Sequence, residues 1–205
     1  MELILVRHGN TFAAGDKIVW VGRNEDVPLT AEGELQAQHI AEAFCDEKIS
    51  AVYCSHLQRT RRFAEIICSA LALSGQPLFD ERLTEIDYGS WGGKSRDEVI
   101  AMQGSTYIEA WEKECIWPPS GIWGSTLDEI KQGVLDFCND LVQKYKDDEH
   151  VIVVTSNGCI RFFLNLLDEV PQEIKNNHGK VKTGAACSLD YKNGQYKLNY
   201  WDKRP

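Results

Sequence analysis

The 205-residue chain contains no apolar run that approaches the roughly 20 residues needed to cross a lipid bilayer. Its first residues, MELILVRHG, also lack the basic start and the length of a secretory signal. The missing apolar run argues against a membrane-spanning protein. Together the two absences lead us to expect a cytoplasmic protein with no membrane partner.

The chain also has no excess of positively charged residues. Asp and Glu outnumber Lys and Arg by 31 to 22, which gives a formal net charge of −9. Such a chain is poorly suited to nonspecific binding of nucleic acids or anionic membranes, so we expect no nucleic-acid partner. A small anionic substrate is compatible with this charge only if a local cluster of positive groups receives it.

Paired cysteines and metal-ligand spacings are also lacking. The seven cysteines are scattered, odd in number and partly inside apolar runs, and none forms a CxxC pair. We therefore interpret them as small core residues of a protein in a reducing compartment. No cluster has the spacing of metal ligands, and we expect neither a metal nor another cofactor.

Apolar patterns predict strands that alternate with helices. Continuous apolar or β-branched runs indicate buried strands at 3–6, 51–54 and 151–155, and 78–93 indicates a strand followed by a loop. Helical spacing predicts helices over about 30–44, 55–73, 95–113 and 126–145. Asn193-Gly194 indicates the turn of a closing hairpin. Together these elements predict one α/β domain over residues 1–205, with three layers around a largely parallel sheet.

Three of the predicted strands end in polar groups, namely Arg7-His8-Gly9, Ser55 and Ser156-Asn157-Gly158. Ligands of such sheets bind beyond the carboxyl ends of the strands, so we expect these ends to share a site. Arg59 follows Ser55 by about one helical turn and is able to point back to the same edge. Each of these groups alone fits a solvated loop equally well. Only their combination indicates a shared site.

The motifs LVRHG, PLTAEG, SHLQRT, LTEIDYGSWGG and VVTSNG follow one another along the chain. In this order they closely resemble the histidine phosphatase superfamily, also called the phosphoglycerate mutase-like family, over nearly the whole chain. The resemblance implies an α/β/α sandwich, in agreement with the fold predicted above. It also implies hydrolysis of a small phosphorylated metabolite through a phosphohistidine, and it admits a homodimer.

Matching the motifs residue by residue implies a role for each candidate. His8 matches the nucleophile, for which a neutral imidazole near pH 7 is suited. Glu85 matches the general acid that protonates the leaving alcohol and then activates water. Arg7 and Arg59 match the arginines that hold the phosphoryl oxygens. The implied substrate-binding positions are Arg7, Asn10, Thr11, Gly22, Arg23, Arg59, Asn157 and Gly158, of which Arg23 fits an exposed loop charge equally well.

Asn157 departs from the family, because it stands where relatives carry a second catalytic histidine in a Ser-His-Gly turn. An amide donates a neutral hydrogen bond but supplies no positive charge. Loss of one such donor typically costs ~10²–10³ in rate, so we expect reduced activity. None of His39, His56, His150 and His178 is favoured as a replacement, although the loop that carries His178 is able to approach the site.

Several interpretations stay open at this point. The favoured one is a phosphomonoesterase with reduced activity, for which the α-ribazole phosphate phosphatase is one candidate relative. A noncatalytic binder of phosphate ligands and an enzyme whose histidine was replaced deliberately are the alternatives. A mutase-type phosphotransferase is disfavoured, because 88–128 is short and Arg96 is its only arginine. The Trp-rich loop 116–125 fits a lid over the substrate, but simple packing is favoured.

Overall fold

The computed structural model describes residues 1–205 and contains one six-stranded sheet in the order β3-β2-β4-β1-β5-β6. The first four of these are parallel neighbours, whereas β5 is antiparallel to both of its neighbours, β1 and β6. The sheet is therefore mostly parallel, as the apolar runs predict. Its strands are β1 (Glu2–Arg7), β2 (Ile49–Cys54), β3 (Leu78–Phe79), β4 (His150–Thr155), β5 (Ala186–Lys192) and β6 (Gln195–Lys203).

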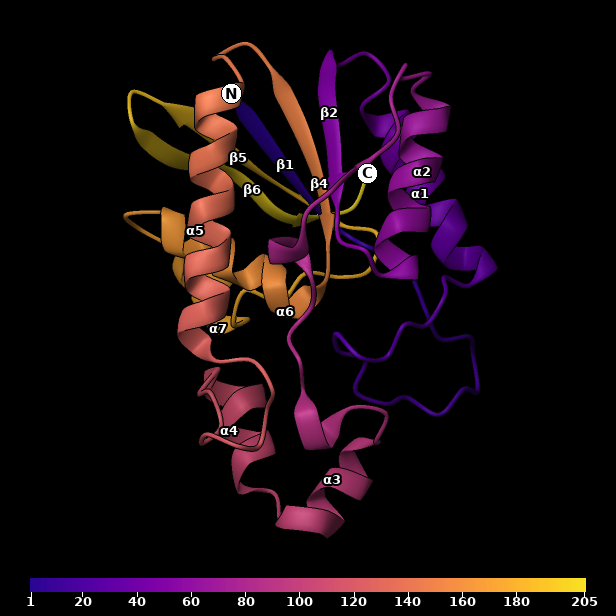
Figure 1. The fold of residues 1–205 in the computed structure, drawn as a ribbon, viewed down its shortest axis with the longest axis vertical. Coiled ribbons are helices and arrows are strands. Elements are labelled where there is room, and N and C mark those ends of the chain that lie inside the picture. The colour runs from indigo at the N-terminus through magenta and orange to yellow at the C-terminus, as the bar shows by residue number, and fades with distance from the viewer.

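Helices cover both faces of the sheet (Figure 1), with α1 and α2 on one face and α5, α6 and α7 on the other. Alternate residues of β1 serve the two cores: Leu3 and Leu5 pack toward α5, and Ile4 and Val6 toward α1 and α2. This confirms the three-layer α/β/α arrangement. The helices are α1 (Ala31–Ala43), α2 (Gln58–Ala70), α3 (Arg96–Gln103), α4 (Thr106–Glu114), α5 (Leu127–Lys144), α6 (Asn157–Ile160) and α7 (Gln172–Asn176).

Most expected elements are present, and the main correction concerns 95–113. This range forms two helices, because Gly104 ends α3 with a φ of +80° that a continuing helix does not allow. The strand expected near 78 has only two residues and leads into 3₁₀ turns. Asn193 and Gly194 both have positive φ, as the expected hairpin turn requires. None of the helices combines the length and apolar character that a bilayer crossing requires.

A lobe built from α3 and α4 extends beyond the sheet (Figure 1) and has its own aromatic core. Trp123 is 6% exposed and packs edge to face against Trp91, Trp111 and Trp117. Neither Trp117 nor Trp123 lines the large cavity described below. The packing interpretation of the Trp-rich loop is thus confirmed, and the lid interpretation is wrong.

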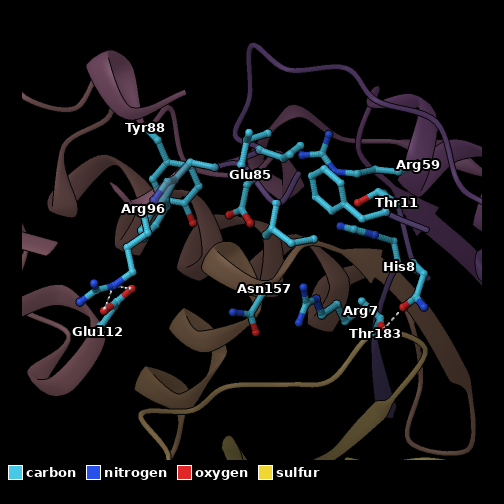
Figure 2. Close-up of a pocket in the computed structure, with 16 residues that line it drawn as sticks. Arg7, His8, Thr11, Arg59, Glu85, Tyr88, Arg96, Glu112, Asn157 and Thr183 are labelled. Carbon is cyan, nitrogen blue, oxygen red and sulfur yellow. Dashed lines mark hydrogen bonds and ion pairs between the residues drawn. The ribbon is translucent and has the colours of Figure 1, made fainter. Parts of the chain in front are cut away.

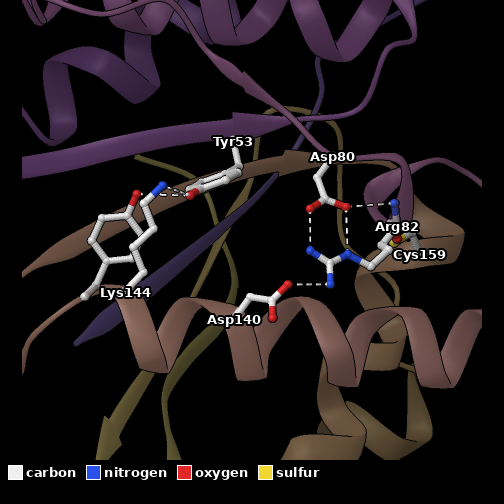
Figure 3. Close-up of polar contacts among 7 residues, drawn as sticks. Tyr53, Asp80, Arg82, Asp140, Lys144 and Cys159 are labelled. Atoms are coloured by element: carbon white, nitrogen blue, oxygen red, sulfur yellow. Dashed lines mark hydrogen bonds and ion pairs between the residues drawn. The ribbon is translucent and has the colours of Figure 1, made fainter.

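The segment between β3 and Glu85 is fixed to α5 by Arg82 (Figure 3). Its guanidinium donates to Asp80 at 2.6 and 2.9 Å and to Asp140 of α5 at 2.7 Å. The Arg82 carbonyl accepts a weak hydrogen bond from Cys159 Sγ on α6. Because these contacts lie three residues before Glu85, they restrict where that carboxylate is able to sit.

Candidate active site

The ends of β1 and β4 and the start of α2 surround one cavity of about 630 Å³ (Figure 2). Its lining includes Arg7, His8, Arg59, Glu85 and Asn157, so the structure brings all five predicted catalytic positions together. Gly9 allows the chain to leave β1 beside α1: a Cβ there would lie 2.4 Å from the carbonyl oxygen of Gly33. Only two glycines in contact permit this approach.

His8 is buried and held in one tautomer. Its Nδ1–H donates to the carbonyl of Gly9 at 2.8 Å, which leaves the Nε2 lone pair free. Burial, followed by the charges of Arg59 and Arg7, holds the pKa of His8 well below its usual 6.5. The imidazole is therefore neutral and nucleophilic even in mildly acidic solution.

This lowered pKa predicts a pH-dependent contribution to stability. Below pH 6.5 the unfolded chain binds a proton at His8 that the native chain does not, so the native state loses stability as the pH falls through that window. A His8→Asn variant lacks this loss. Urea unfolding from about pH 7.5 to about pH 5 should show the stability of the unmodified chain falling, relative to the variant, by up to about 1.4 kcal/mol per pH unit. Parallel pH curves for the two proteins would contradict the assignment.

The buried Arg59 and the half-buried Arg7 supply positive charge beside His8. Arg7 Nη1 donates to the carbonyl of Val181 at 2.6 Å, and Arg59 donates to the carbonyls of Gly22 and Glu25 at 2.9 and 2.8 Å. Burial lowers the pKa of both guanidinium groups, and the nearby Glu85 carboxylate opposes that effect. Arginine stays protonated at neutral pH, so the two groups form a fixed cationic pocket in an acidic protein.

Asn10 and Thr11 line the same end of the cavity, as the motif match implies. Thr183 Oγ1 donates to Asn10 Oδ1, so the amide nitrogen of Asn10 is left as the donor for a ligand. Thr183 also lines the cavity and was not predicted from the sequence. It adds a polar group from the loop before β5 to the end of the cavity that Asn10 and Thr11 line.

Glu85 is 4% exposed and receives three backbone hydrogen bonds. Its Oε2 accepts from the N–H of Gly158 at 3.0 Å, and Oε1 accepts from those of Cys159 and Ile86 at 3.1 and 2.9 Å. These donors fix the orientation of the carboxylate. Tyr88 stands beside it with its hydroxyl toward the cavity (Figure 2), and burial raises the pKa of this phenol, which keeps its proton as a donor.

Gly158 makes this carboxylate position possible, and Gly158→Ala is expected to disturb it. An added Cβ would lie 2.2 Å from Glu85 Oε1 and 2.8 Å from the Tyr88 hydroxyl, so the acid must move. A displacement of about 1 Å costs roughly 10²-fold in rate, and kcat for an aryl phosphate should fall by that order. The control is Gly133→Ala in α5, where the new Cβ meets nothing closer than 3.6 Å. Equal kcat values for the two variants would contradict this account.

Asn157 faces the cavity with its amide orientation fixed. Its Oδ1 accepts from the N–H of Val181 at 3.0 Å, so the Nδ2 group is the part that can donate to a ligand. Arg161, one helical turn later, does not replace the missing charge, because its guanidinium lies over the Trp111 ring and outside the cavity lining.

No histidine other than His8 lines the cavity. His39 and His56 are exposed, and His150 lies at the opposite end of β4 near Glu2 and Glu47. His178 is half-buried and borders a different cavity together with Arg161. The expectation that none of them substitutes for the missing histidine is consistent with these positions.

Three of the predicted substrate-binding positions do not line the cavity. Arg23 is exposed and borders a separate depression with Asp26 and His56, which fits the loop-charge interpretation. Gly22 is buried and acts through its carbonyl, which accepts from Arg59. Gly158 likewise acts through its N–H on Glu85. Both glycines therefore position candidate catalytic side chains, those of Arg59 and Glu85.

Comparisons with known proteins show which family and fold the chain shares. The chain is 25% identical to a 2,3-bisphosphoglycerate-dependent phosphoglycerate mutase of Azorhizobium caulinodans over 180 residues, or 83% of each chain. Its fold is similar to a mycobacterial glucosyl-3-phosphoglycerate phosphatase in complex with VO3 (TM-score 0.82, 22% identity, 98% of both chains). It is also similar to the α-ribazole phosphatase of Shigella flexneri (TM-score 0.78, 24% identity, 100% of this chain and 97% of that chain). The model of the histidine phosphatase superfamily (branch 1) matches residues 3–204, and the chain therefore belongs to that superfamily.

Proposed function

We propose that the protein is a phosphomonoesterase that hydrolyses a small phosphorylated metabolite through a phosphohistidine at His8. The observation that carries this proposal is the state of His8: its Nδ1–H is bound to Gly9, and its Nε2 is free beside the buried Arg59 and the half-buried Arg7. A neutral imidazole in a cationic pocket is suited to attack on a phosphate ester.

The reaction has two steps. The Nε2 lone pair of His8 attacks phosphorus, an N–P bond forms, and the P–O bond to the leaving group breaks while Glu85 gives its proton to the departing oxygen. Glu85 then takes a proton from water, whose oxygen attacks phosphorus. The N–P bond breaks, its electron pair returns to His8, and inorganic phosphate leaves. Arg7 and Arg59 hold the phosphoryl oxygens through both steps.

Asn157 lowers the rate of this chemistry without removing the phosphate pocket. Its Nδ2 donates one neutral hydrogen bond to a phosphoryl oxygen, worth about 1 kcal/mol, where a charged donor contributes roughly 1.5–3 kcal/mol. Arg7, Arg59, Asn10 and Thr11 remain to bind phosphate. Affinity for phosphate therefore survives better than turnover does.

Phosphoglycerate mutase-type transfer is the second candidate, since the curated relatives that match the chain include such mutases. A mutase must hold a second anionic group at the far end of its site. Arg96 is the only cation that lines the cavity there, and it is paired with Glu112. We therefore favour transfer to water.

The deciding experiment is the incubation of the protein with an aryl phosphate and a glycerol acceptor. Release of inorganic phosphate supports the phosphatase, whereas appearance of glycerol phosphate in excess over phosphate supports the transferase. Binding of vanadate without any turnover would overturn both and support the noncatalytic binder.

A further inference from the structure

The cavity is far larger than a phosphate group requires. Its volume of about 630 Å³ lies in the range of sites that enclose whole small molecules. Figure 2 places Arg96 and Glu112 on the side opposite His8 and Arg59. If the phosphate of a bound ester lies beside His8 and Arg59, its leaving group must extend toward Arg96 and Glu112.

Arg96 and Glu112 form an ion pair at this far end. Arg96, on α3, donates through Nε to the two carboxylate oxygens of Glu112, on α4, at 3.1 and 3.3 Å. The two Nη groups of Arg96 make no hydrogen bond to the protein. The side chains are 48% and 33% exposed, so both remain accessible to a ligand.

This pair is not required to hold the lobe together. An exposed ion pair contributes only about 0–1 kcal/mol, and the two helices are already joined by the aromatic core that contains Val99, Ile108 and Trp111. The position of the pair in the lining of the cavity therefore indicates a role in ligand binding.

The wall between the two ends is aromatic and rigid. Trp20 and Tyr88 both line the cavity, and their rings pack edge to face at 5.0 Å. Trp20 also packs against the buried Trp91 at 4.9 Å. An aromatic wall of this kind suits the C–H face of a carbon chain or ring.

We propose that Arg96 and Glu112 bind the hydroxyl groups of an uncharged, polyhydroxylated leaving group, which makes phosphomonoesters of sugars and other polyols the preferred substrates. This inference rests on the proposed function. A hydroxyl donates to the Glu112 carboxylate while its neighbour accepts from a free Nη of Arg96. A second anion is disfavoured, because it would meet the Glu112 carboxylate beside Arg96, the only cation that lines this end of the cavity.

Three six-carbon phosphate esters test this selectivity: sorbitol 6-phosphate, 6-phosphogluconate and hexyl phosphate. The first has a neutral hydroxylated far end, the second differs in carrying a carboxylate there, and the third has no hydroxyl groups. Affinity is measured by calorimetry and phosphate release is measured separately. Sorbitol 6-phosphate should bind roughly tenfold more tightly than hexyl phosphate, as one or two additional hydrogen bonds imply. It should also bind roughly tenfold more tightly than 6-phosphogluconate, because the Glu112 carboxylate repels the carboxylate of that ester.

A matched pair of variants assigns the effect to Glu112. Glu112→Gln should reduce the preference for sorbitol 6-phosphate over 6-phosphogluconate by roughly tenfold, because the repulsion of the carboxylate disappears. Glu109→Gln makes the same charge change on the same helix, but Glu109 pairs with Lys113 outside the cavity, and the preference should not change.

The outcomes separate the two proposals. Equal affinities for the three esters, or equal shifts in the two variants, would overturn the polyol assignment even if all three esters are hydrolysed. The expected ranking without phosphate release would support the binding site and overturn the proposed hydrolysis.

Discussion

Replacement of His8 by alanine is expected to abolish phosphate release from an aryl phosphate, with a fall in kcat of about 10⁴-fold or more. The reason is geometric: with Nδ1–H donating to Gly9, His8 Nε2 is the group left free to attack at the cationic end of the cavity. No second histidine lines the cavity to take its place. The measurement is initial-rate kinetics of both proteins at saturating substrate.

The matched control is His39→Ala, which removes an exposed imidazole from α1 far from the lining residues. It should retain the full rate. Vanadate binding by the His8→Ala protein provides a check on folding, since Arg7 and Arg59 remain. A His8→Ala protein that binds vanadate and still turns over at the original rate would rule out the phosphohistidine mechanism.

The fold was predictable because its central strands, β1 and β4, are buried on both faces. Leu3 to Val6 alternate between two cores, and only an apolar run satisfies both. The break between α3 and α4 was missed, because a single glycine within a helical pattern is usually tolerated. Gly104 ends the helix through its φ of +80°, which the letters alone do not reveal.

The end of the site around His8 was predictable for a different reason. Arg7 is the last residue of β1, His8 follows it, and Asn157 lies two residues after β4. Neighbouring parallel strands bring their carboxyl ends together. Thr183 was missed because its contact with Asn10 spans 173 residues, and no local pattern marks it. Arg96 and Glu112 were missed as a pair for the same reason, since their meeting depends on how α3 and α4 pack.

Replacement of Asn157 by histidine is expected to raise kcat for an aryl phosphate by about 10²-fold. Asn157 Oδ1 is occupied by the N–H of Val181, so its amide offers the phosphoryl group only the neutral N–H groups of Nδ2. A protonated imidazole adds positive charge where negative charge develops in the transition state. Steady-state kinetics of the asparagine, histidine and alanine forms should rank them His, Asn, Ala, with alanine roughly fivefold below asparagine for the loss of about 1 kcal/mol.

The pH profile distinguishes a charge effect from a simple change in shape. The rate gained by Asn157→His should disappear as the pH rises through the pKa of the new imidazole, whereas the unmodified chain has no titrating group at this position. If the histidine form is no faster at any pH, the missing charge does not limit this enzyme. Asn157 would then be a working part of a pocket in which two arginines and a neutral amide are sufficient.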